Sequence, residues 1–339
     1  MFSSLFHGVL TYLFLSQFQN LAGAFPPVSI GVTYSRLANN LPPAQETIDL
    51  CRQKGLRKIR LYKPHKDALN ALQHSALEVI LGVGNEDIVK LAFTKGFAEN
   101  WVNTYVRPYK GAVGFTMIAV GHGINPGDRL AQALVPAMQA LKDILHTDEE
   151  LLTIYVTTPV NINWLSEIHP PSAATFDARY MITIKPIVEF LQQGSPVMLC
   201  DLYPYYAYKQ NPAYKDIALD YALHSSSTVM VQDGNIGYTN MLDGLIDAFM
   251  FAMEKVGVLD VKVYVSETGW PISPGVDLAT PQNAETYILN VFKRLSAAAK
   301  SPKSRWPNQI FIYNLYLQNQ AIGETRNFGL FRPNKQQIY

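Results

Sequence analysis

Residues 78–83 read EVILGV, a run in which one Glu is followed only by apolar residues and a glycine. Because polar and apolar side chains do not alternate in this run, we expect both faces of the strand to be buried. Burial on both faces is typical of parallel strands covered by helices. A similar run, QIFIYNL, occupies residues 309–315. The sequence therefore predicts a parallel sheet built from distant parts of the chain.

Short β-rich runs of this kind recur along the chain and are separated by amphipathic segments. Residues 43–54 and 129–145 have helical spacing, and the first of these segments stops just before Gly55. Strands that alternate with helices eight times predict a closed (β/α)8 barrel, the TIM barrel. The expected strands are residues 28–34, 58–62, 78–83, 115–121, 152–158, 196–202, 262–267 and 309–315.

A doubly wound open sheet is the alternative arrangement of such a pattern. That fold carries a Gly-rich phosphate-binding turn after its first strand, where this chain reads GVTYSRLANN from Gly31. The 339 residues allow one large domain or two ordinary ones. Since no linker interrupts the pattern, we interpret residues 25–339 as a single barrel domain.

The composition excludes several classes of protein. The chain has 28 Lys and Arg against 27 Asp and Glu, so its net charge is +1. Nucleic-acid binding would require a basic stripe, and the near-zero charge argues against it. Disorder is excluded by an apolar content of 48%. The chain is instead rich in aromatic residues, with 19 Tyr, and poor in charge.

The N-terminal segment, residues 1–24, contains no Lys, Arg, Asp or Glu. A short apolar stretch is followed by Ala22-Gly23-Ala24, which fits the small-x-small cleavage pattern of a secretory signal peptide. A short N-terminal membrane anchor is the alternative, but the apolar stretch falls short of the ~20 residues that span a bilayer. We therefore expect a secreted protein without stable membrane insertion.

The two cysteines and seven histidines do not indicate a disulfide framework or a metal site. Cys51 and Cys200 lie in apolar surroundings far apart in the sequence, which predicts buried free thiols. The histidines do not cluster with carboxylates at ligand spacing. We expect no metal and no cofactor.

In a barrel of this type, chemistry is located just after the C-terminal end of each strand. The residues at these positions are mostly aromatic or hydrogen-bonding, with few cations. Such a lining suits a neutral ligand rich in hydroxyl groups, because sugar rings pack on aromatic faces. The positions are Tyr34, Tyr62, Asn85, His122, Gly123, Thr158, Asp201, Tyr203, Glu267, Trp270, Tyr316 and Gln318.

Several longer motifs resemble the plant family 17 glycoside hydrolases, the endo-1,3-β-glucanases. They include IGVTYSRLANNLPP from Ile30, AVGHGINPGD from Ala119, YPYYAYKQNP from Tyr203, VSETGWP from Val265 and NFGLFRPNKQ from Asn327. The resemblance covers residues 30–339 and implies a (β/α)8 barrel that needs no cofactor. It also implies a monomer that acts on β-1,3-glucan in the extracellular space, the apoplast or the cell wall.

The resemblance implies a retaining hydrolysis by two carboxyl groups roughly 5 Å apart. Glu267 in VSETGWP matches the nucleophile of the family. Five further positions match residues of the substrate cleft, and they are Tyr34, His122, Tyr203, Trp270 and Gln318.

The general-acid position departs from the family pattern. Where the family has Gly-Asn-Glu, this chain has Gly121-His122-Gly123, so a glycine replaces the acid and a histidine replaces the Asn that holds a sugar hydroxyl. Further departures from the family pattern are Ser35 for Gly, Lys63 for Asp, Asp201 for Asn, Gln318 for Glu and Ala321 for Lys. These differences fall on polar cleft positions, whereas the motifs that build the scaffold are intact.

Three functions are consistent with this pattern. The first is a glucan-binding protein whose hydrolysis is lost or severely weakened, since a positioned acid contributes typically 10²–10⁴-fold. The second is an active endo-1,3-β-glucosidase in which His122 or Asp201 supplies the proton. The third is a folded relic without binding or activity. Without a second carboxyl at residue 123, we expect Glu267 to titrate as a single group.

Overall fold

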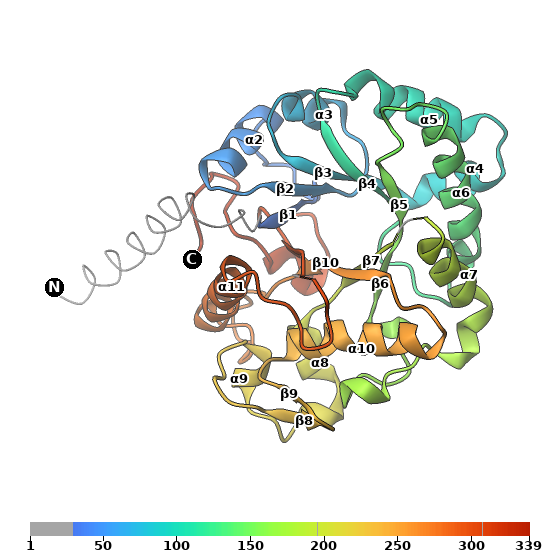
Figure 1. Ribbon diagram of the computed structural model, residues 1–339. Coiled ribbons are helices and arrows are strands. Elements are labelled where there is room, and N and C mark those ends of the chain that lie inside the picture. The colour runs from blue at the N-terminus through green and yellow to red at the C-terminus, as the bar shows by residue number, and fades with distance from the viewer. Residues whose placement is uncertain (1–29, 195, 307) are drawn as a thin grey trace.

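The computed structural model describes residues 30–194, 196–306 and 308–339 (Figure 1). The predicted signal peptide, residues 1–24, lies outside the described residues. The main sheet has nine strands in the order β5-β4-β3-β2-β1-β11-β10-β7-β6, and every neighbouring pair is parallel. The strands are β1 (Gly31–Tyr34), β2 (Lys58–Leu61), β3 (Glu78–Val83), β4 (Gly114–Val120), β5 (Tyr155–Thr157), β6 (Pro159–Asn161), β7 (Val197–Asp201), β10 (Lys262–Thr268) and β11 (Ile310–Ile312).

The sheet curls into a barrel whose two edges are consecutive in the chain. β5 and β6 stand at opposite ends of the strand order, yet only Thr158 separates them. The Thr157 hydroxyl donates to the carbonyl of Val197 at 2.8 Å, which ties the end of β5 to the start of β7. The expected (β/α)8 barrel is therefore confirmed, and the open doubly wound sheet is wrong. The predicted fifth strand, residues 152–158, is shortened to β5, and the chain continues after Thr158 as β6, a strand that the sequence analysis did not predict.

Helices surround the barrel (Figure 1). The predicted helix 43–54 corresponds to α2. The predicted helix 129–145 begins instead as a 3-10 turn, η3 (Arg129–Ala133), before α6 continues it. The α-helices are α2 (Ala44–Gln53), α3 (Lys66–Leu72), α4 (Asn85–Phe93), α5 (Phe97–Tyr105), α6 (Leu134–Leu145), α7 (Met181–Gln192), α8 (Pro204–Gln210), α9 (Leu219–Ala222), α10 (Met241–Lys255) and α11 (Pro281–Ser296).

The barrel interior is a packed core. Alternate strand residues meet there in one buried cluster, while the other faces of the strands pack against the helices. Gly31 is required at one close approach, because a Cβ at this position would lie 2.5 Å from the ring of Phe311. The interior cluster contains Ile80, Met117, Ala119, Val197, Leu199 and Phe311.

A hairpin outside the barrel is an element that the sequence analysis missed. β8 (Val231–Asp233) and β9 (Ile236–Tyr238) pair antiparallel. Gly234 makes the turn with a left-handed φ of 58°. A Gly-Asn pair, here Gly234-Asn235, between two short runs is a local signal for a two-residue hairpin turn. That signal was present in the sequence and would have found this element.

Both cysteines are free and buried, as predicted. Burial raises the pKa of the Cys51 thiol to about 12, so the reactive thiolate is scarce at physiological pH. Within the described ranges, no helix combines the length and the apolarity that crossing a bilayer requires.

Asp247 on α10 gives the fold a pH dependence that can be measured. Its carboxyl group is fully buried and accepts hydrogen bonds from the Tyr238 hydroxyl at 3.0 Å and the Lys303 amide at 2.9 Å. Burial raises the pKa of Asp247 to about 6 from its ordinary 3.8. The folded protein holds this proton more tightly than the unfolded chain. The resulting stability is present below about pH 4 and is lost as the pH rises through 6.

We expect the change in the free energy of unfolding caused by Asp247→Asn to be about 3 kcal/mol more favourable at pH 8 than at pH 4, because the wild type loses the stability of its buried, protonated Asp247 as the pH rises. Urea unfolding of the wild type and the variant at both pH values measures this difference. The exposed Asp260→Asn is the matched control and should change stability equally at the two pH values. An Asp247→Asn effect that does not vary with pH would contradict the prediction.

Candidate active site

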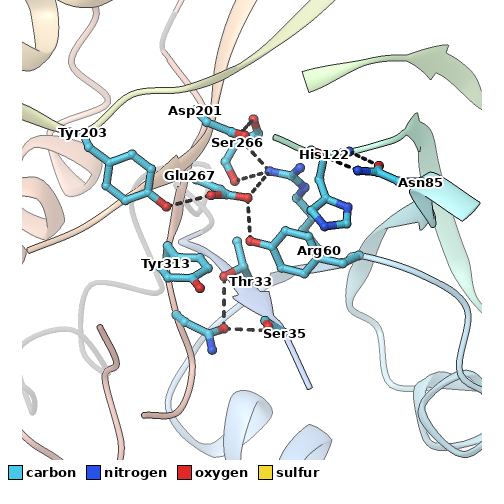
Figure 2. Close-up of polar contacts among 12 residues, drawn as sticks. Thr33, Ser35, Arg60, Asn85, His122, Asp201, Tyr203, Ser266, Glu267 and Tyr313 are labelled. Carbon is cyan, nitrogen blue, oxygen red and sulfur yellow. Dashed lines mark hydrogen bonds and ion pairs between the residues drawn. The ribbon is translucent and has the colours of Figure 1, made fainter. Parts of the chain in front are cut away.

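Glu267 lies near the end of β10, at the C-terminal mouth of the barrel, and three donors surround its carboxylate (Figure 2). Oε1 accepts from Arg60 Nη1 at 3.0 Å and from the Tyr62 hydroxyl at 2.5 Å. Oε2 accepts from the Tyr203 hydroxyl at 2.7 Å. The residue is only 8% exposed. Both carboxylate oxygens are therefore held in fixed directions before any ligand arrives.

Arg60 on β2 joins this group to a second carboxylate. Its Nη1 lies 3.0 Å from Asp201 Oδ1 and 3.0 Å from Glu267 Oε1, and it also donates to the Ser266 carbonyl at 3.1 Å. The guanidinium is buried and packs over the ring of Tyr62 at 5.0 Å. The sequence analysis missed Arg60, although an Arg between Ile59 and Leu61 in a short strand indicates a charge that needs partners if the strand is buried.

The protonation of Glu267 differs from the expectation. Burial is the main cause that raises the pKa of Glu267 to about 7, and the negative charge of Asp201 is the second. Arg60 and the hydroxyls of Tyr62 and Tyr203 lower this pKa, but by less. The prediction that Glu267 titrates as a single group is wrong, because Asp201 shares Arg60 with it. The resemblance located a missing carboxyl at residue 123, but it did not show that Asp201, on the adjacent strand β7, lies beside Glu267.

The segment after β4 has a conformation that suits glycine. Gly121 and Gly123 both adopt left-handed φ values, 78° and 61°. Asn85 holds the intervening His122 by its main chain, accepting from the amide at 3.0 Å and donating to the carbonyl at 3.0 Å. A Cβ at Gly123 would meet no atom of the described residues within 4 Å. Open space therefore stands at residue 123, where no side chain can donate a proton.

His122 itself faces the site from this segment. Its ring lies edge-on to Tyr62, with 5.4 Å between the ring centres. Desolvation and the charge of Arg60 lower the pKa of His122, so the imidazole is neutral at pH 7. Among the described residues, no hydrogen bond connects His122 to Glu267.

The chain from residue 30 to residue 339 matches the profile described as Glycosyl hydrolases family 17. The protein belongs to glycoside hydrolase family 17. It is 36% identical to a probable glucan endo-1,3-beta-glucosidase of Arabidopsis thaliana over 311 residues, which cover 90% of this chain and 88% of the relative. It is 35% identical to a glucan endo-1,3-beta-glucosidase of Pisum sativum, covering 91% of this chain and 84% of that one.

Solved structures of family 17 members have the same fold. One of two plant beta-glucan endohydrolases with distinct substrate specificities superimposes with a TM-score of 0.85 at 34% identity, covering 91% of this chain and 99% of that chain. CJP38, a beta-1,3-glucanase and pollen allergen of Cryptomeria japonica, gives a TM-score of 0.86 at 32% identity, with 92% and 98% covered. The family scaffold is therefore complete in this chain.

Two departures from the family pattern lie in direct contact. The Ser35 hydroxyl donates to Gln318 Oε1 at 2.5 Å, and Gln318 Nε2 donates in turn to the Tyr313 hydroxyl at 2.9 Å. Gln318 is 1% exposed. The rings of Tyr313 and Tyr203 contact each other, with 6.1 Å between their centres. The two hydrogen bonds and this ring contact together connect Ser35 to the side chains around Glu267. The replaced residues form a connected network.

Two residues expected in the cleft of this family 17 member are buried elsewhere. Tyr34 is 2% exposed and packs edge-on against Tyr316. Trp270 is 1% exposed, and its indole donates to the carbonyl of Leu278 at 2.7 Å. Such burial leaves little surface for a sugar, and we assign both rings to packing. Tyr203 remains partly exposed beside Glu267.

Charged side chains near the site are paired. Lys63 pairs with Glu86 at 3.3 Å, and Arg36 with Asp67 at 2.6 Å. In the part of the chain that the structure describes, no three His, Cys, Asp or Glu side chains gather as metal ligands. The mouth of the barrel thus offers tyrosine hydroxyls, aromatic edges and one shared guanidinium.

Proposed function

We propose that this family 17 protein is a secreted β-1,3-glucan-binding protein whose hydrolytic activity is lost or severely weakened. The observation that carries the proposal is the open space at Gly123, beside an intact set of donors around Glu267. The names of its relatives, glucan endo-1,3-beta-glucosidases, support the choice of ligand. We further propose that it acts as a monomer in the apoplast or the cell wall.

The site offers suitable partners for a neutral glycan. The tyrosines that bond Glu267 stay uncharged, because burial raises the pKa of Tyr62 and of Tyr203. Sugar hydroxyls form hydrogen bonds with such groups, and the partly exposed ring of Tyr203 offers an apolar face. The neutral imidazole of His122 can donate and accept. Glycan binding needs only these contacts, whereas hydrolysis also needs an acid.

An active enzyme with an unusual acid is the second candidate, and the retained donors around Glu267 favour it. Its proton would have to come from His122 or Asp201. Asp201 Oδ1 accepts from Arg60 at 3.0 Å and from the Ser266 hydroxyl at 2.6 Å. Two donors therefore already engage this oxygen of Asp201. His122 is neutral at pH 7 and lacks a hydrogen bond to the nucleophile among the described residues.

Calorimetric titration with β-1,3-gluco-oligosaccharides tests glucan binding. We expect the wild type to bind and Tyr203→Ala to weaken binding about tenfold or more, because an aromatic face and a hydroxyl are both removed. The matched control is Tyr155→Ala, at the first residue of β5 and thus at the opposite end of the barrel, which should leave affinity unchanged.

The outcomes separate the three functions. Absence of binding by the folded wild type would contradict the proposal and favour a relic without a ligand. Binding with release of reducing ends at the rate of the relatives would favour the second candidate. Binding with little or no release is the expected result.

A further inference from the structure

Two buried carboxylates at the candidate site compete for one nitrogen of Arg60. Nη1 carries two hydrogens but faces three acceptors, which are Asp201 Oδ1, Glu267 Oε1 and the Ser266 carbonyl, at 3.0, 3.0 and 3.1 Å. The neighbouring Nε of Arg60 is buried and has no hydrogen-bond partner within the part of the chain that the structure describes. The guanidinium therefore does not form a two-pronged bond with either carboxylate and cannot satisfy both at full strength.

The charges of this group do not balance when both carboxylates are ionised. Arg60 contributes one positive charge, while Asp201 and Glu267 contribute two negative charges. The side chains of Asp201 and Glu267 are only 10% and 11% exposed. In such surroundings, two close carboxylates hold a proton more readily than either would alone. One added proton makes the group neutral.

Glu267 is the carboxyl whose affinity for a proton this arrangement raises. Asp201 Oδ1 accepts from the Arg60 guanidinium and the Ser266 hydroxyl, and Glu267 accepts from Arg60, Tyr62 and Tyr203. Burial and the negative charge of Asp201 outweigh the three donors at Glu267 and raise its pKa to about 7.

Other titratable groups facing Glu267 stay neutral near pH 7. They are Tyr62 after β2, Tyr203 after β7, Tyr313 after β11 and His122 after β4. Burial raises the pKa of each tyrosine, and desolvation lowers the pKa of His122. Arg60, also from β2, remains charged. Glu267 is thus the group of this set that changes charge around neutrality.

We propose that Asp201 is a positioning residue that competes with Glu267 for Arg60 and thereby keeps Glu267 protonated up to neutral pH. A protonated Glu267 presents an O–H donor to a bound hydroxyl, and it cannot attack an anomeric carbon. The loss of catalysis then has two causes, the missing acid at Gly123 and the masked nucleophile. The effect on glucan rests on the proposed function, whereas the protonation of Glu267 does not.

Carbon NMR of protein labelled at the Glu side-chain carboxyl tests the protonation without any ligand. The signal that disappears in Glu267→Gln is assigned to Glu267 and followed from pH 4 to pH 9. We expect a midpoint near pH 7 in the wild type, and one about 1–2 pH units lower in Asp201→Asn, which removes the competing charge. The matched control is Asp67→Asn, which removes an exposed carboxylate paired with Arg36 and should leave the midpoint unchanged.

Each outcome decides the proposal. A wild-type midpoint near the ordinary 4.5 would overturn it without any variant. An Asp201→Asn midpoint equal to that of the wild type would overturn the role of Asp201, and Asp201→Ser repeats this comparison if the Asn variant does not fold. Glucan affinity measured over the same pH range should fall above pH 7. Lack of glucan binding with the expected midpoints would reject the proposed function and leave this inference standing.

Discussion

We expect this protein to release reducing ends from a β-1,3-glucan about 10²–10⁴-fold more slowly than a family 17 relative that has both carboxyl groups. Without a side chain at Gly123, the departing sugar must leave as an unprotonated alkoxide. An aryl β-glucoside with a good leaving group does not need this proton. At pH 8, where Glu267 is ionised, we expect the gap to shrink to within about tenfold on such a substrate. A reducing-end assay and an aryl-release assay measure the two rates.

Two variants control this prediction. Glu267→Ala should abolish aryl release, since no nucleophile remains. Gly123→Glu should raise glucan hydrolysis about tenfold or more, because the new side chain enters open space. Because the backbone at residue 123 is left-handed, the new side chain should lower the free energy of unfolding by about 1–2 kcal/mol. Wild-type hydrolysis at the rate of the relative, lost in Glu267→Ala, would contradict the absence of an acid.

Arg60→Met is expected to lower the free energy of unfolding by about 3–5 kcal/mol at pH 8. Methionine fills similar space but leaves the carboxylates of Asp201 and Glu267 buried without their cation. At pH 5 we expect a smaller loss, because Glu267, with a pKa of about 7, then carries a proton. Urea unfolding at both pH values measures the two losses.

A second arginine provides the comparison for this prediction. Arg36 pairs with Asp67 at 2.6 Å, but the two side chains are 27% and 55% exposed. Solvent screens such a pair, and Arg36→Met should cost at most about 1 kcal/mol. If both variants lose the same stability at pH 8, the network around Glu267 does not stabilise the fold in the way that its burial implies.

The barrel could be predicted because its strands are buried on both faces. Runs such as residues 78–83 have no polar alternation, and burial is the property that the sequence pattern reports most directly. The strand β6 was not predicted, because it is only three residues long and begins with a proline. The hairpin at Gly234 was missed for a similar reason. Its strands are three residues long, and only its turn carries a clear signal.

The candidate site could be predicted only in part. Glu267 and Gly123 were located by their motifs, since both stand at strand ends. The contact between Arg60 and Asp201 joins residues 141 positions apart, and a sequence pattern carries no information on such a distance. Tyr34 and Trp270 were expected in the cleft because they follow strand ends, but the direction of a side chain there depends on how the following loop turns.

The bonds from Asn85 to the main chain of His122 bear on how a protein like this one arises. They fix the course of the segment through main-chain atoms that every amino acid except proline possesses. The rim of the barrel therefore keeps its shape whatever side chain stands at residue 122. Evolution can therefore exchange the reactive side chain at residue 122 while the backbone of the rim stays the same. A combinatorial library at residues 122 and 123 would sample new chemistries on an unchanged scaffold, with the left-handed residue 123 restricted mainly to Gly and Asn.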